Sequence, residues 1–255
     1  MTSRMHLFEF GDQEWLPEAW RRYITEYLQF MLIHGPFSRL PELLARVGEE
    51  GDEGIVDLCS GSGGPWPRYV EEGGDTLADV DVVLTDLHPN VDAYARIEEE
   101  TGGRVRGHEQ PVDAADVPDD LDGPRTIING LHQFPPEAAQ AILADAVEDG
   151  AAIGVFEIMD RRFVTLLTTL FVPLFVLLAT PFVRPFRLGR LFWTYLIPIM
   201  PLMIFWDGLV SALRTYSPED LKGFVEEWDS YEWDIGTVPA DQPPSRITYL
   251  IGKPR

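Results

Sequence analysis

A turn of small residues after an apolar run is the part of the chain best suited to hold a small ligand. The run GIVDL (54–58) is followed by Cys59 and then by five small residues, SGSGG (60–64). Glycines in such a turn let the backbone approach a bound molecule closely. This spacing predicts a binding site, and the residues around it indicate the kind of ligand.

Two phosphate-binding patterns do not fit this turn. The nicotinamide fingerprint G-x-G-x-x-G, started at Gly61 and Gly63, needs a third glycine where the chain has Trp66. A P-loop needs a lysine directly after its last glycine, and the nearest lysine is Lys222. A nicotinamide-dependent oxidoreductase is therefore disfavoured.

Three acids lie at the ends of predicted strands. Asp57 precedes the turn, Asp86 ends the run DVVLTD (81–86), and Asp113 ends the next predicted strand. In a doubly wound sheet such strand ends open on one crevice. Acids there repel a pyrophosphate, but they suit a cofactor with a positive charge and two ribose hydroxyls, such as S-adenosylmethionine.

The turn and the acids resemble the motifs of class I S-adenosylmethionine-dependent methyltransferases over 54–158 and 217–254. The family's first motif, acid-x-Gly-x-Gly-x-Gly, stands here as DLCSGSG (57–63), with Cys59 in place of the first glycine. The resemblance implies that S-adenosyl-L-methionine is the cofactor. It implies cofactor contacts from ten residues: Asp57, Cys59, Ser60, Gly61, Gly63, Asp86, Leu87, Asp113, Ala114 and Asn129.

The same resemblance assigns tasks within this set. Asp86 corresponds to the acid that binds both ribose hydroxyls, and Leu87 borders the adenine. The pair Asp113-Ala114 corresponds to the adenine-edge pair. Asn129 begins NGLHQF (129–134), which resembles the segment that lines the reacting centre.

Two residues are candidates for catalysis. His132 lies in this segment, and a histidine with an ordinary pKa of about 6.5 suits a general base near neutral pH. The alternative is a histidine that only packs over the cofactor, because alignment of acceptor and methyl group supplies much of the rate. Glu157, at the end of the fifth predicted strand, is expected on the substrate side. No metal is expected.

The elements that must position these residues alternate along the chain. Strands are predicted at 54–58, 81–86, up to 113, 125–131 and 151–158, and helices at 65–72, 90–100 and 135–148. A C-terminal helix from Ser217 and a hairpin (231–239 and 245–253) follow. The predicted fold is α/β, with a doubly wound, mostly parallel seven-stranded sheet, an antiparallel C-terminal hairpin and an apolar helical insert.

The predicted domains are an N-terminal helical cap (1–48) and a Rossmann-like methyltransferase domain (49–255) that carries the insert (161–216). The cap contains an amphipathic helix over 14–32, with Pro17 in its first turn. The insert contains two runs without a charge, 163–183 and 191–206.

Three structures remain open for the insert. Four prolines favour short buried helices that form a lid or a dimer contact. The flanking arginines favour a hairpin that lies in one membrane leaflet, through about 161–210. The first run is also long enough to span a bilayer. Six arginines and one acid give 161–216 a net charge of +5, whereas the rest of the chain carries −27.

The overall composition restricts partners and compartment. A net charge of −22 opposes binding to nucleic acid. Many acids and only two lysines suit a halophile's cytosol, although a GC-rich genome also favours arginine over lysine. The acidic N-terminus lacks a secretory signal, and Cys59 is the only cysteine, so we expect a cytoplasmic protein, with peripheral or monotopic membrane attachment left open.

The leading functional hypothesis is a methyltransferase that acts on a hydrophobic or amphiphilic small molecule, such as a lipid or an isoprenoid. The alternative is a non-catalytic S-adenosylmethionine-binding protein of the same fold, which acts through a partner or a membrane contact. The acceptor atom and the oligomeric state do not follow from the sequence.

Overall fold

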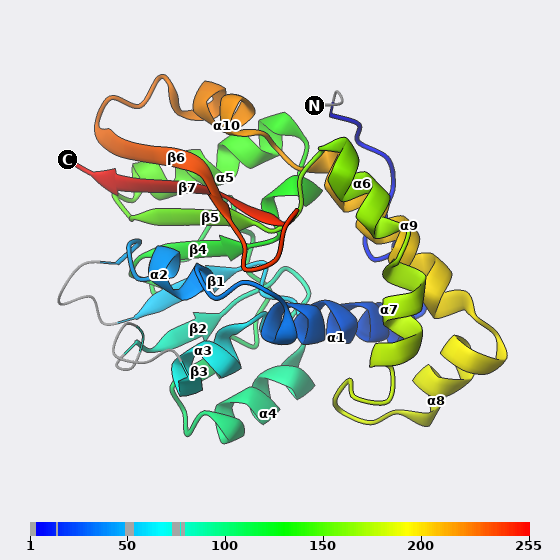
Figure 1. Ribbon diagram of the computed structural model, residues 1–255. Helices are drawn as coiled ribbons and strands as arrows, with labels where there is room; N and C mark the ends of the chain where they lie inside the picture. The colour runs from blue at the N-terminus through cyan, green and yellow to red at the C-terminus, as the bar shows by residue number, and fades with distance from the viewer. Residues whose placement is uncertain (1–3, 14, 49–53, 73–76, 78–79) are drawn as a thin grey trace. The chain divides into compact units, whose positions relative to one another are not determined.

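The computed structural model describes residues 4–13, 15–48, 54–72, 77 and 80–255 (Figure 1). The chain forms two compact units. The helical unit comprises Met1–Gly35 and Met159–Thr215, and the sheet unit comprises Pro36–Ile158 and Tyr216–Arg255. The helical unit thus combines most of the predicted cap with almost all of the predicted insert.

The sheet unit contains seven strands in the order β3-β2-β1-β4-β5-β7-β6 (Figure 1). The pairs among β1 to β5 are parallel, and β7 is antiparallel to both β5 and β6. This confirms the predicted sheet with its C-terminal hairpin. The strands are β1 (Ile55–Leu58), β2 (Val82–Leu84), β3 (Val105–Gly107), β4 (Arg125–Ile128), β5 (Ile153–Glu157), β6 (Tyr231–Pro239) and β7 (Arg246–Pro254).

Helices cover this sheet because its parallel strands are buried on both faces. The apolar sides of α5 (Pro136–Glu148) and α10 (Pro218–Val225) share one core with β1, β4, β5 and β7. The remaining helices of the unit are α2 (Leu40–Leu44), α3 (Trp66–Glu72) and α4 (Val91–Glu100), with a 3-10 turn, η2 (Leu131–Gln133). The predicted helices at 65–72, 90–100 and 135–148 correspond to α3, α4 and α5.

Predicted strands 81–86 and 151–158 end slightly early, at Leu84 and Glu157, and two others end at least three residues early. The third strand is predicted to reach Asp113, but β3 ends at Gly107. Asp113 lies in a loop, where it forms an isolated bridge with Asp116. The fourth was extended to Leu131, but β4 ends at Ile128 because Asn129 takes a left-handed φ of 55°. An extended strand requires a negative φ, so pairing stops there.

The helical unit is built on α1 (Glu18–His34), with Pro17 at its N-cap rather than in its first turn. Its other elements are α6 (Phe163–Thr169), α7 (Val172–Ala179), α8 (Leu188–Leu191), the π-helical turn η3 (Phe192–Leu196) and α9 (Ile199–Arg214). Tyr23 of α1 shares a core with Met200 and Met203 of α9, and Tyr27 shares another with Val176 of α7. The N-terminal helix α1 thus packs against both α9 and α7.

Prolines set the ends of the insert helices, as a missing N–H group and a fixed φ predict. Pro173 lies in the first turn of α7 and Pro198 is the N-cap of α9. Among the described residues, no single helix is long and apolar enough to cross a membrane. One pair of helices, Leu188–Leu196 and Ile199–Arg214, is together long and apolar enough to cross a membrane, but the two helices are bent by 85° relative to each other.

Candidate active site

The glycine turn follows β1 with several residues in left-handed conformations. The φ angles are 57° at Cys59, 57° at Gly61, 92° at Gly63 and 49° at Gly64. Glycine adopts such angles without strain, so the turn needs its glycines for conformation. A Cβ atom built on Gly61 or Gly64 would meet nothing within 4 Å, which leaves space for a ligand against this backbone.

Asp57 lies within β1 and contacts the glycine turn through Ser60. Its Oδ1 accepts a hydrogen bond from Thr126 Oγ1 at 2.7 Å, and its Oδ2 lies 2.7 Å from Ser60 Oγ. Burial raises the pKa of Asp57 to about 6, although these hydrogen bonds favour its charged form. Both carboxylate oxygens and the Ser60 hydroxyl are therefore engaged within the protein.

Asp86 follows β2 and faces the turn directly. Gly61 N donates to its Oδ2 at 2.9 Å and His88 N donates to its Oδ1 at 2.9 Å. Burial raises its pKa, but the side chain is only half-buried. A carboxylate oxygen has two acceptor positions, so each oxygen retains one toward a ligand hydroxyl.

Cys59 connects the β1 and β4 ends of the sheet. A Cβ atom on Gly130 would lie 3.3 Å from Cys59 Cβ, so the two turns touch. Burial, together with Asp86, Asp57, Asp113 and Glu157, raises the thiol pKa well above its usual value. The residue is therefore a neutral packing group and no nucleophile at neutral pH.

The predicted adenine-side residues lie beyond β2 and β3. Val112 N donates to Asp86 O at 3.0 Å, which brings the loop of Asp113 next to Asp86. Asp113 is exposed and accepts a hydrogen bond from Ala115 N, whereas Ala114 is buried in the core. Leu87 is 53% exposed, so its side chain is accessible at the surface.

Asn129 carries an unpaired acceptor at the end of β4. Its Oδ1 is buried and has no hydrogen-bond partner among the residues that the structure describes. Its backbone N donates to Phe156 O at 2.7 Å, and its φ of 55° turns the chain away from the sheet. A buried acceptor without a donor is unfavourable by itself, so this geometry suits a bound cation or N–H group.

His132 and Glu157 form a buried pair at the ends of β4 and β5. His132 N donates to Glu157 Oε1 at 2.9 Å, and His132 Nδ1 lies 2.8 Å from Glu157 Oε2. Both side chains are almost completely buried. Because the carboxylate accepts the proton on Nδ1, the neutral ring has Nε2 as its basic nitrogen.

Some supporting residues escaped the sequence analysis. Asn90 caps α4 and also donates to Ser62 Oγ at 3.1 Å, which ties the glycine turn to that helix. Thr126 is fully buried and holds Asp57. The sequence could have indicated Thr126, because it is a hydroxyl residue in the otherwise apolar run TII (126–128). No sequence pattern indicates that Asn90 pairs with Ser62.

The site fits S-adenosylmethionine in three respects. Asp86 offers acceptors for two ribose hydroxyls, Asn129 Oδ1 offers one for an ammonium group, and Gly61 leaves room for the ligand. In the part of the chain that the structure describes, no group of three or more His, Cys, Asp and Glu side chains is arranged to hold a metal ion.

Similarity to known proteins is structural. No protein-family model and no curated protein matches the chain. The plantazolicin methyltransferase BpumL, solved with SAH, is 11% identical, with a TM-score of 0.60 over 96% of this chain and 94% of that one. The fold is that of the class I S-adenosylmethionine-dependent methyltransferases.

Two larger proteins share this methyltransferase fold. The O-methyltransferase NcsB1 from neocarzinostatin biosynthesis, solved with S-adenosylmethionine and 2-hydroxy-5-methyl naphthoic acid, is 15% identical with a TM-score of 0.53. An O-methyltransferase family 2 protein from Planctomyces limnophilus, solved with apigenin, is 15% identical with a TM-score of 0.51. The matches cover 92% and 89% of this chain but only 57% and 61% of those proteins.

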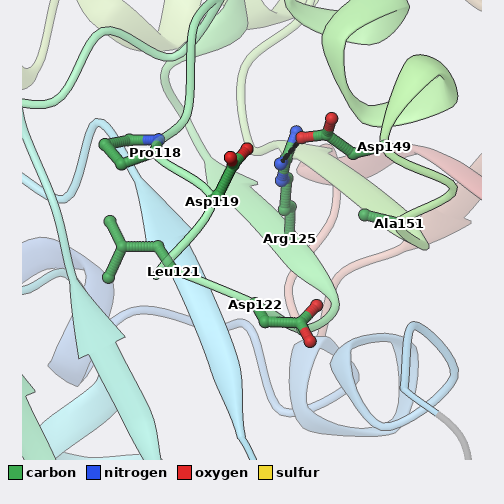
Figure 2. A pocket seen from close by; sticks show the side chains of 8 residues that line it. Pro118, Asp119, Leu121, Asp122, Arg125, Asp149 and Ala151 are labelled. Carbon is green, nitrogen blue, oxygen red and sulfur yellow. Dashed lines mark hydrogen bonds and ion pairs between the residues drawn. The ribbon is translucent and has the colours of Figure 1, made fainter.

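A separate hollow lies at the opposite edge of the sheet, where β4 and β5 begin. Its volume is about 250 Å³, and its lining includes Asp119, Asp122, Arg125 and Asp149 (Figure 2). Arg125 donates to Asp145 at 2.6 Å and also pairs with Asp149. The guanidinium is thus held by two carboxylates of α5 and its C-cap, which indicates a structural ion pair rather than a ligand site.

Proposed function

We propose that this protein is an S-adenosylmethionine-dependent methyltransferase that methylates a hydroxyl group of a hydrophobic or amphiphilic small molecule. The pairing of His132 with Glu157 carries the proposal. It places a histidine of defined tautomer at the strand ends that also bear Asn129 and the glycine turn. A protein that only bound the cofactor would not need a basic nitrogen held in this way.

The bound cofactor would supply an activated methyl group, whose bond to the sulfonium sulfur would break during the transfer and leave S-adenosylhomocysteine. Asp86 would hold its ribose by two hydrogen bonds, and Asn129 would accept one from its ammonium group. Asp57, buried beneath the turn, would act by fixing Ser60 and thereby the backbone against which the ligand lies. We assign Glu157 a positioning task through His132, because its carboxylate already accepts two hydrogen bonds from that residue.

His132 Nε2 would take the proton from the acceptor hydroxyl as the new O–C bond forms. The imidazolium that results is stabilised by the Glu157 carboxylate on Nδ1. Two neighbours of the same fold were solved with 2-hydroxy-5-methyl naphthoic acid and with apigenin, which supports hydroxylated, largely apolar acceptors. Lipid and isoprenoid alcohols also carry a hydroxyl group on an apolar body, but an aliphatic hydroxyl is less acidic than the phenols of these two ligands.

The proposal is tested in two steps. Isothermal titration with S-adenosylhomocysteine first measures cofactor binding by the full chain. Turnover is then followed as formation of S-adenosylhomocysteine with a panel of naphthols, flavonoids and long-chain prenyl alcohols. Binding without turnover on any acceptor would favour the non-catalytic alternative, and absence of binding would refute the cofactor assignment.

A further inference from the structure

The helical unit buries several polar groups beside its apolar cores and exposes many large apolar side chains. Tyr27 Oη contacts Thr180 Oγ1 and lies 3.2 Å from Thr194 Oγ1, and both threonines are buried. Buried Glu26 accepts from Arg190 and, at 2.7 Å, from Arg187 Nε. Soluble domains bury their leucines and phenylalanines and expose such charges.

The outer surface of the insert is correspondingly apolar. Of 23 large apolar side chains with high exposure among the described residues, 17 lie between Phe163 and Leu202. Those more than half exposed include Phe163, Leu170, Phe171, Leu178, Phe182 and Leu188. At 150–250 Å² per large side chain, the 17 together expose on the order of 1,500 Å², several times the largest patch of an ordinary monomer.

The helical unit, which exposes the apolar side chains, also differs from the sheet unit in net charge. The helical unit has nine arginines and seven acids, a net charge of +2, whereas the sheet unit has eleven basic residues and 35 acids, a net charge of −24. Within the insert, the arginines flank the apolar runs. Arg162 precedes the first run, and Arg184 and Arg187 follow it.

We propose that the insert, from Phe163 to Leu202, docks into one leaflet of an anionic lipid membrane. Its apolar side chains enter the acyl region, while exposed Arg184 and half-buried Arg187 reach the phosphate groups. The broken helices suit insertion into a single leaflet, because none is a straight span and one pair is bent by 85°. Attachment to membranes does not depend on methyl transfer.

Lipid fits this surface better than a second copy of the chain does. A two-fold contact buries one patch, but here α6, α7, η3 and the start of α9 all carry exposed apolar residues. The helical unit of a second copy has the same net charge of +2, whereas phosphate groups attract exposed Arg184.

Flotation of the full chain with vesicles tests the proposal. Vesicles of phosphatidylcholine, alone or with about 30% phosphatidylglycerol, are used at about 0.1 M and about 1 M salt. We expect flotation with both vesicle types that persists at high salt, because salt does not weaken apolar burial. The triple variant Leu170→Ser/Phe171→Ser/Leu178→Ser should reduce the bound fraction at least about tenfold.

Two further variants separate the contributions. Arg184→Glu should weaken binding to the anionic vesicles by about ten- to thirtyfold at low salt and have little effect at high salt. Val91→Ser, an exposed apolar residue of the sheet unit, is the matched control and should float as the wild type does. The triple variant should keep its circular dichroism spectrum and its affinity for S-adenosylhomocysteine. Loss of flotation with cofactor binding intact therefore reports on the membrane contact, and not on the proposed methyltransferase function.

Recovery of the wild type in the soluble fraction under all four conditions overturns the proposal. Light scattering then identifies what covers the apolar face of the insert. A dimer that the triple variant dissociates indicates a second copy of the chain. A monomer indicates that the face is covered within the chain.

Discussion

His132 and Glu157 are joined by two hydrogen bonds, one from the backbone N–H and one from the ring of the same histidine to the two oxygens of one carboxylate. The backbone bond fixes where the histidine lies, and the ring bond fixes which nitrogen is basic. The adjacent strands β4 and β5 bring the two residues together, since Ile128 pairs with Phe156 one residue before Glu157.

Replacement of Glu157 by Gln should separate positioning from cofactor binding. The amide retains one acceptor but presents N–H groups to Nδ1, which favours the wrong tautomer. We expect turnover to fall by roughly 10²–10⁴, as in other histidine–carboxylate pairs, with S-adenosylhomocysteine affinity unchanged within about twofold. Glu137→Gln, an exposed acid on α5, is the matched control. Equal losses of turnover and affinity would indicate that the pair only packs.

Asp86 should govern cofactor affinity. Asp86→Asn keeps an acceptor for one of the two backbone N–H groups but loses the charge that strengthens bonds to ribose hydroxyls. We expect S-adenosylhomocysteine to bind at least about tenfold more weakly, since a hydrogen bond to a charged group contributes roughly 1.5–3 kcal/mol. Calorimetry measures this, with exposed Glu98→Ala as control. Unchanged affinity would contradict the ribose assignment.

Asn129 permits a test with two substitutions at one position. Asn129→Gly removes the unpaired Oδ1 while keeping the left-handed backbone, so thermal stability should hold and S-adenosylhomocysteine should bind about tenfold more weakly. Asn129→Ala should lose the same affinity and also roughly 1 kcal/mol of stability, because its Cβ disfavours a φ of 55°. If both variants bind as the wild type does, the orphan acceptor has no part in binding.

The uneven charge predicts a response to salt. With 35 acids against eleven basic residues, the sheet unit repels itself in dilute buffer, and salt screens this repulsion. We expect the unfolding temperature of the intact protein to rise between about 0.1 M and about 2 M KCl. Differential scanning calorimetry measures it. A flat or falling midpoint would instead favour genome composition as the reason for the scarcity of lysine.

The succession of strands along the chain and the mostly parallel sheet with its C-terminal hairpin could be predicted from sequence because they depend on local patterns. Buried parallel strands are nearly continuous apolar runs, and the residue after each run falls at the edge where ligands bind. This rule places the glycine turn, Asp86, Asn129 and Glu157 together without knowledge of contacts. The glycines identify the turn because four left-handed φ angles occur within six residues.

The partners of the site residues could not be predicted, because they depend on side-chain geometry between distant segments. Asp57 binds Thr126 and Ser60 inside the sheet, and Glu157 turns toward His132. The end of β3 was missed since nothing in the apolar pattern marks Gly107 as the last paired residue. In the insert, residues are apolar on nearly every side, so periodicity cannot show which face points outward.

Asp207 should make stability depend on pH. It is buried near the middle of α9, where Phe10 N and Gly11 N donate to its carboxylate, and burial raises its pKa to about 7. Between about pH 4 and 7, the folded protein holds a proton that the unfolded chain has released. The free energy of unfolding therefore falls as pH rises through this range, by at most about 1.4 kcal/mol per pH unit.

The variant Asp207→Asn isolates this effect, because its amide cannot titrate and its Oδ1 still accepts one of the two backbone N–H groups. Urea unfolding at pH 5, 6, 7 and 8 should give a shallower pH dependence for the variant than for the wild type. Asp57, whose burial raises its pKa to about 6, contributes with the same sign in both proteins and cancels in the difference. Parallel pH profiles would show that Asp207 is charged throughout, and that the N–H groups of Phe10 and Gly11 compensate for its burial.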